Sequence, residues 1–96
     1  MAKFIYRISY KASAAKELRK LDKPNQIRLL NAIEDLATNP RPDGVKKLKG
    51  KYTHYRIRVG SYRVIYEISD GELRVLVLRV AHRKDIYREI PPSWSL

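Results

Sequence analysis

The sequence predicts an α+β domain with the order β-α-α-β-β-β, in which a helical hairpin packs on one face of a small antiparallel sheet. Three features of the pattern support this class. Residues 4–8 alternate with period two, residues 11–38 show helical spacing, and residues 55–80 alternate again around two turn signals. At 96 residues with 44% hydrophobic side chains, the chain has material for one core, so we expect a single domain over residues 1–96.

The first predicted strand covers residues 1–9, in which apolar and other side chains alternate from Phe4 to Ile8. A helix is then predicted over residues 11–21, because small and apolar side chains recur there on one helical face. These side chains are Ala14, Ala15, Leu18 and Leu21.

A second helix is predicted to begin near Pro24, because proline is tolerated in the first turn of a helix and not in its interior. We expect it to reach Thr38 and to end at the proline-containing and glycine-containing residues 39–44. Its predicted core positions repeat every three residues. They are Ile27, Leu30, Ile33 and Leu36. The two helices are expected to form an antiparallel hairpin whose basic outer faces are solvated.

A β-hairpin is predicted over residues 55–66. Gly60-Ser61 is expected to form a two-residue turn with glycine in the first position. This register places Arg58 opposite Arg63 on one side of the sheet, with Arg56 beside them. Because like charges directly opposite each other destabilise a sheet, we expect the fold to hold these guanidinium groups ready for an anion.

A final strand is predicted over residues 72–80, after an Asp70-Gly71 type I′ turn. The alternation then separates a nearly apolar face, expected under the helices, from an open face of mixed character. The open face is expected to carry Arg56, Arg58, Arg63, Ile65, Glu67, Arg74, Leu76, Leu78 and Val80, with its aliphatic side chains forming an exposed strip. The chain should leave this strand at the arginine end, so that His82, Arg83 and Tyr87 can reach Arg58 and Arg63.

Positive charge is the strongest bulk signal. The chain has a formal net charge of +11 and a pI near 10.1, and residues 46–66 contain basic side chains without any acid. The basic residues of this segment are Lys46, Lys47, Lys49, Lys51, Arg56, Arg58 and Arg63. A surface of this sign concentrates polyanions, so nucleic acid is the first expected partner and an acidic protein the second.

Membrane and secreted classes are disfavoured. The longest apolar run is residues 75–78, which is too short to span a membrane, and neither helix has a continuous apolar face opposite a wholly basic one. The chain contains no cysteine and no visible signal peptide, which favours a cytoplasmic location.

The converging cations suit phosphate chemistry. Arginines keep their protons, bind phosphate and stabilise the extra negative charge of a pentacovalent transition state. Nearby positive charge favours the phenolate of Tyr87, which can then act as a general base, or the ring can stack on a nucleotide base. These parts suffice for RNA cleavage by the RNA's own 2′-hydroxyl, without a metal or cofactor. No metal site is predicted, because the acids are dispersed and neither His54 nor His82 has the spacing of a ligand pair.

The same residues also fit phosphate or carboxylate binding without catalysis. His82 likewise fits the end of a strand with no catalytic task, as well as a contact with RNA. These readings stay open on the residues alone.

Several segments resemble the RelE/ParE superfamily of bacterial and archaeal toxins, and in particular its RelE branch. They are Leu48-Lys49-Gly50, Tyr55-Arg56-Ile57-Arg58, residues 60–66 (GSYRVIY) and residues 80–87 (VAHRKDIY). The resemblance covers nearly the whole chain and implies the toxin of a type II toxin-antitoxin pair. In the RelE branch, such a toxin is a ribosome-dependent endoribonuclease that cuts mRNA in the ribosomal A site and leaves a 2′,3′-cyclic phosphate and a 5′-hydroxyl.

The resemblance also implies roles for individual residues. Arg56, Arg58, Arg63, Arg83 and Tyr87 match the positions of the branch's catalytic basic residues and tyrosine, and among them Arg58 is assigned to the neighbouring RNA backbone. The branch often has lysine where this chain has Arg56 and Arg58, which shifts the role of general base toward Tyr87 because an arginine cannot give up a proton. Further RNA contacts are expected from Lys46, Lys47, Lys49, Lys51, Arg58 and His82.

The implied partners are mRNA, the ribosome and an acidic antitoxin that folds on binding. Two alternatives remain: a ParE-like toxin that poisons DNA gyrase, and an RNA-binding module without catalysis. Residues 91–96 are expected to be either a flexible tail or a segment that packs back.

Overall fold

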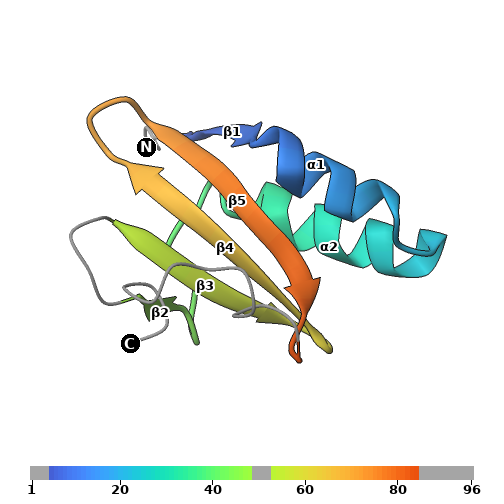
Figure 1. The fold of residues 1–96 in the computed structure, drawn as a ribbon. Coiled ribbons are helices and arrows are strands. Elements are labelled where there is room, and N and C mark those ends of the chain that lie inside the picture. Colours follow the sequence, from blue (N-terminus) through green and yellow to red (C-terminus); the bar gives the residue numbers. More distant parts are fainter. Residues whose placement is uncertain (1–4, 49–52, 85–96) are drawn as a thin grey trace.

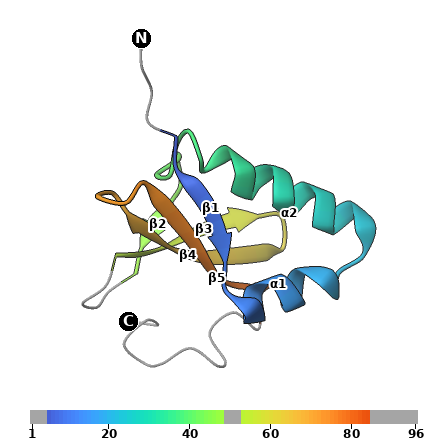
Figure 2. The same cartoon turned by 90° about the horizontal axis from the view of Figure 1, so that it is seen from above.

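The structure, a computed structural model, describes residues 5–48 and 53–84. Two helices lie on one side of a five-stranded sheet with the strand order β1-β5-β4-β3-β2 (Figures 1 and 2). The elements are β1 (Arg7–Tyr10), α1 (Ala12–Arg19), α2 (Lys23–Asp35), β2 (Lys46–Lys47), β3 (His54–Val59), β4 (Tyr62–Ser69) and β5 (Arg74–His82). The predicted α+β class and order are confirmed, with the short strand β2 added. Within the described ranges, neither helix has the length and apolar character needed to cross a membrane.

Strand β1 lies at the edge of the sheet and pairs with β5 in parallel, with Arg7 opposite Arg74. The expectation of a purely antiparallel sheet is therefore wrong for this strand. Parallel neighbours need a long connection, and here both helices and three strands lie between the two partners. The backbone N–H of Tyr6 donates to the carbonyl of Ala37 (2.7 Å), which ties the start of β1 to the end of the helical layer.

The main core lies between the helices and the sheet. In α2, Leu29 and Ile33 are buried, as is Leu36 just after the helix, whereas Ile27 and Leu30 are 51% and 38% exposed. The predicted repeat of three is therefore wrong at these two positions. A helix has 3.6 residues per turn, so a core-facing stripe takes positions i, i+4 and i+7, which here are 29, 33 and 36. The core positions Ala14 and Leu18 of α1 are confirmed.

The β3–β4 hairpin has the predicted register. Val59 pairs with Tyr62, and Arg58 pairs with Arg63. Gly60 has φ +60°, the conformation that the first residue of a type II′ turn requires and that glycine adopts without strain. The turn therefore fixes which side chains of both strands share a face.

The β4–β5 connection differs from the prediction. Ser69 pairs with Arg74, so four residues form the loop, and Leu73 carries the positive φ (50°). The N–H of Leu73 donates to the carbonyl of Asp70 (3.2 Å), and β5 begins two residues later than predicted. The Asp70 side chain accepts hydrogen bonds from Tyr6 and Arg41, which hold the loop in this form.

A β-bulge in β5 changes which face its last residues occupy. Ile65 pairs with Arg79 whereas Tyr66 pairs with Val77, so Leu78 is the extra residue. Val80, predicted on the open face, consequently pairs with Val64 and belongs to the main core, where it is 3% exposed.

Candidate anion-binding site

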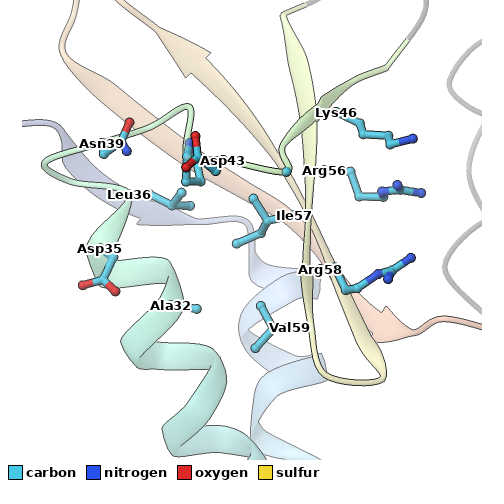
Figure 3. A pocket seen from close by; sticks show the side chains of 12 residues that line it. Ala32, Asp35, Leu36, Asn39, Asp43, Lys46, Arg56, Ile57, Arg58 and Val59 are labelled. Carbon is cyan, nitrogen blue, oxygen red and sulfur yellow. The ribbon is translucent and has the colours of Figure 1, made fainter.

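The candidate site lies on the face of the sheet opposite the helices. Arg58 of β3 is paired directly with Arg63 of β4. Arg56, also in β3, pairs with Lys46 of β2 along the other edge of that strand. Figure 3 shows the side chains of Lys46, Arg56 and Arg58 projecting to the same side, away from α2. We call Lys46, Arg56, Arg58 and Arg63 the arginine cluster. The sequence predicted that the three arginines share one face, whereas Lys46 joins them through β2, a strand that was not predicted.

Arg63 is the most enclosed member of the cluster. It is 8% exposed, and its Nη1 donates to the carbonyls of Tyr62 (3.1 Å) and Gly60 (3.5 Å). Arg58, directly opposite, is exposed to solvent. The turn therefore fixes one guanidinium group while its neighbour is accessible, an arrangement that can bind an anion between a rigid and an adaptable cation.

The end of β5 lies beside the same turn. The backbone N–H of Arg83 donates to the carbonyl of Ser61 (2.8 Å), so Arg83 follows the strand at the arginine end of the sheet, as predicted. Tyr87, Lys49 and Lys51 lie outside the described residues.

His82 lies on the other side of the sheet from the cluster. It pairs with Tyr62, and the two rings meet edge to face at 5.7 Å, whereas Arg63 pairs with Ala81. The expectation that His82 reaches Arg58 and Arg63 is wrong in this geometry, because the extra residue in β5 reverses the alternation.

Lys47 pairs with Tyr55, a residue of the main core, so the strand alternation also directs Lys47 away from the cluster. Of the two lysines in β2, only Lys46 shares the face of the arginines.

The aliphatic part of this face is buried and not exposed. Ile65 is 0% and Leu78 is 7% exposed, and they form a second small core. Leu48, Leu76 and Ala81 pack against it. The expected exposed aliphatic strip is thus wrong, because these side chains cluster with one another and with the end of β2.

A pair that the sequence reasoning missed lies farther along the same face. His54 is 5% exposed, and its Nε2 lies 3.3 Å from Oε2 of Glu67. The signal was present, since continuing the predicted register one step beyond Tyr55 and Tyr66 places His54 opposite Glu67.

Behind the cluster lies a cleft of about 640 Å³ between the end of α2, residues 39–44 and β3. Ile57 and Val59 point toward the helix on this side (Figure 3). Asp35 and Asp43 line the cleft opposite them. Lys46, Arg56 and Arg58 also line this cleft, but the cationic ends of their side chains project away from α2 (Figure 3).

Known proteins share this sequence pattern and fold. A sequence model described as the ParE toxin of the type II toxin-antitoxin system parDE matches residues 8–87. The chain belongs to the RelE/ParE toxin superfamily. Among its relatives is Toxin RelE3 of Methanocaldococcus jannaschii, 39% identical over 61 residues, which are 64% of this chain and 61% of that protein. The mRNA interferase toxin RelE of Escherichia coli K12 is 30% identical over 88% of this chain and 92% of its own length.

A solved structure supports the same assignment. The archaeal RelE-RelB complex from Pyrococcus horikoshii contains a chain that superposes with a TM-score of 0.75 at 31% identity, covering 82% of this toxin-family chain and 96% of that chain. The relatives named RelE place this superfamily member with the RelE toxins, as the residues themselves had indicated.

Proposed function

We propose that this chain is the toxin of a type II toxin-antitoxin pair and cuts mRNA in the ribosomal A site. The observation that carries the proposal is the turn at Gly60-Ser61. It pairs Arg58 with Arg63 and receives the backbone of Arg83 through Ser61. The E. coli relative is named an mRNA interferase, which supports RNA cleavage as the chemistry of this chain.

The proposed reaction is an in-line displacement at phosphorus. The 2′-oxygen attacks the adjacent phosphorus, its proton passes to the Tyr87 phenolate, the bond from phosphorus to the 5′-oxygen breaks, and the departing 5′-oxygen takes a proton from water. The products are a 2′,3′-cyclic phosphate and a 5′-hydroxyl. Arg56 and Arg63 bind the scissile phosphate, whose charge rises in the transition state, and Arg83 contacts the phosphate and the leaving oxygen.

The ribosome supplies what the isolated protein lacks. An arginine cannot serve as a general base, so the site has no conventional acid-base pair, and the rate depends on the alignment of the 2′-oxygen with the leaving group. We infer that free RNA is cut poorly and that the A site holds the mRNA in the reactive geometry. We expect Lys46 and Arg58 to contact the flanking RNA backbone.

The proposed protein partner is an acidic antitoxin that neutralises the arginine cluster. A net charge of +11 favours such a partner, and the related P. horikoshii toxin was solved with RelB. Binding there would block RNA access and thereby inhibit the toxin.

A second candidate function is inhibition of DNA gyrase. The matching family description is that of a ParE toxin, which favours it. A gyrase inhibitor would not be expected to need the arginines and Tyr87 as one unit.

Primer extension on ribosomes programmed with a defined mRNA tests the proposal. Arg83→Ala and Tyr87→Ala should each lower the rate of A-site cleavage by about 10²-fold or more, because each removes a group that acts in the transition state. The control is Lys23→Ala, an exposed residue at the start of α2. Both variants should also lose growth arrest. If they still arrest growth and inhibit gyrase supercoiling, the second function is correct.

A further inference from the structure

A second pair of arginines lies at the opposite end of the open face. Arg7 of β1 and Arg74 of β5 are directly opposite each other in the parallel ladder. Their sequence neighbours Ile8 and Val75 belong to the helix-side core, so alternation directs both arginines to the same face as the arginine cluster. This face therefore has guanidinium groups at two ends.

No described residue gives this pair a counter-charge. Among residues 5–48 and 53–84, no carboxylate lies within 4.0 Å of either guanidinium group. The nearest acids along β4 and its loop are engaged elsewhere, since Glu67 binds His54 and Glu72 accepts a hydrogen bond from Ser69 (3.1 Å).

The guanidinium of Arg74 is also incompletely hydrogen-bonded. Its Nε is shielded from water and has no hydrogen-bond partner among the described residues. A buried donor without an acceptor costs free energy, as do like charges directly opposite in a sheet. A bound anion would offset the repulsion between the two opposed guanidinium groups.

The geometry of the face indicates which anion fits. Arg63 and Ser69 are six residues apart in β4, and Ser69 pairs with Arg74. At roughly 3.3 Å per residue, the two ends of the face are about 20 Å apart. Figure 1 shows the β3–β4 turn and the β4–β5 loop at opposite ends of the sheet.

Between the two ends, the aliphatic side chains are buried in the second small core around Ile65 and Leu78. The face therefore offers separated positive charge and not an apolar groove. This favours a flexible polyanion with repeated phosphates over an amphipathic peptide.

We propose that Arg7 and Arg74 form a second RNA site, which binds a backbone phosphate of the same strand that the arginine cluster engages. This rests on the proposed function in that the strand is RNA. Each guanidinium group can donate two parallel hydrogen bonds to phosphate oxygens, so two neighbouring arginines can bind the same phosphate. The pair would anchor the strand away from the cleavage position and would be a binding site, not part of the catalytic group.

Salt-dependent binding of a non-cleavable RNA tests this site. The full-length protein is titrated with a fluorescent single-stranded RNA of about twelve nucleotides whose riboses are 2′-O-methylated, at several salt concentrations. For Arg7→Ala/Arg74→Ala, the slope of log K against log[salt] should decrease in magnitude by about 0.7 for each phosphate that the variant no longer binds. An RNA of two nucleotides, too short to reach both ends, should show no difference between this variant and the wild type.

The matched control is Lys16→Ala/Lys20→Ala, which removes two exposed charges at α1. It should leave the slope unchanged, and neither double variant should melt at a lower temperature than the wild type. Equal slope changes in the two variants would show a general charge effect and overturn the proposal. An unchanged slope in the arginine variant would also overturn it while leaving the proposed function intact.

This titration, a titration with the antitoxin and the primer-extension assay on ribosomes separate the remaining outcomes. If the wild type does not bind the RNA, this site fails, while the proposed function stands because the ribosomal A site positions the mRNA there. If the arginine variant binds RNA normally but loses affinity for the antitoxin, the pair is a protein contact and the RNA assignment is wrong. If slope and length dependence change as expected but no mRNA is cut, the site stands and the proposed function fails.

Discussion

At the scale of single residues, Asp70 joins three separate segments. Tyr6 Oη donates to it at 2.6 Å and Arg41 Nη2 at 2.9 Å, and the guanidinium of Arg41 also lies 5.2 Å from the ring centroid of Tyr55. The hydrogen bond from Arg41 lowers the pKa of Asp70, and the bond to Asp70 raises the pKa of Tyr6. The β4–β5 loop, the start of β1 and residues 39–44 are thereby held together.

This cluster gives the stability a defined dependence on pH. The carboxyl of Asp70 has a lower pKa in the folded state than its ordinary value of 3.8, so its contribution is complete above that value and is lost as the pH falls through the folded-state pKa. Asp70→Asn should therefore lower the melting temperature at pH 7, and the difference should shrink below about pH 4. Melts of both proteins from pH 2 to 7 measure this, with Asp43→Asn as control. A difference that persists at pH 2 would contradict it.

The three arginines of the cluster were predictable at this scale because they obey simple alternation around a turn with a strong signal, whereas Lys46 joins them through the unpredicted strand β2. Arg56, Arg58 and Arg63 share a face for reasons contained within residues 55–66. The sequence did not predict the face of the sheet on which His82 lies. That face depends on an extra residue in β5, which no local sequence pattern indicates.

At the scale of elements, the turn at Gly60 controls the site. A Cβ at this position would lie 3.0 Å from Nη1 of Arg28, and the positive φ would strain it. Gly60→Ala should therefore destabilise the protein by about 1 kcal/mol or more. Gly71, in the other hairpin, has no positive φ, and a Cβ added there would have nothing within 4 Å, so Gly71→Ala should be neutral or slightly stabilising. Urea unfolding compares the two, and equal losses would argue against the role of φ.

The bulge in β5 is held by a residue of α1. Glu17 accepts hydrogen bonds from the backbone N–H of Val80 (2.8 Å) and from Nε of Arg79 (3.0 Å). It thereby provides an acceptor for the backbone of β5 beyond the point where β1 ends. Glu17→Ala should cost about 1–3 kcal/mol, because it leaves a partly buried N–H unsatisfied. Glu34→Ala, an exposed acid on α2, is the control for lost charge. Chemical denaturation measures both, and similar values for the two would refute this role of Glu17.

These elements also show where sequence reasoning ends. The hairpin over residues 55–66 and both helices follow from local patterns. The four-residue loop at residues 70–73 and the parallel placement of β1 depend on partners far away in the chain, such as Tyr6 and Arg41. The pairing of His54 with Glu67 falls between these cases, since it required only the continuation of a register already predicted.

At the scale of the whole molecule, charge decides the choice of partners. The chain carries 21 basic and 10 acidic residues, and the described open face presents arginines at two ends. Association with an acidic antitoxin should therefore weaken as ionic strength rises, because screening shortens the range of the attraction. Titration calorimetry at 50 and 500 mM NaCl measures this. Affinity that does not change with salt would show that apolar contacts dominate the complex.

The parallel pairing of β1 with β5 has a consequence for synthesis. Arg7 cannot meet Arg74 until the β5 segment has emerged from the ribosome that is making the chain, because every contact of β1 within the sheet is with that last strand. Contacts between residues so distant in sequence form late and slow folding. A nascent chain that still lacks β5 therefore cannot complete the sheet. On the proposed function, a protein that attacks translating ribosomes reaches its folded form only after its own β5 has been synthesised.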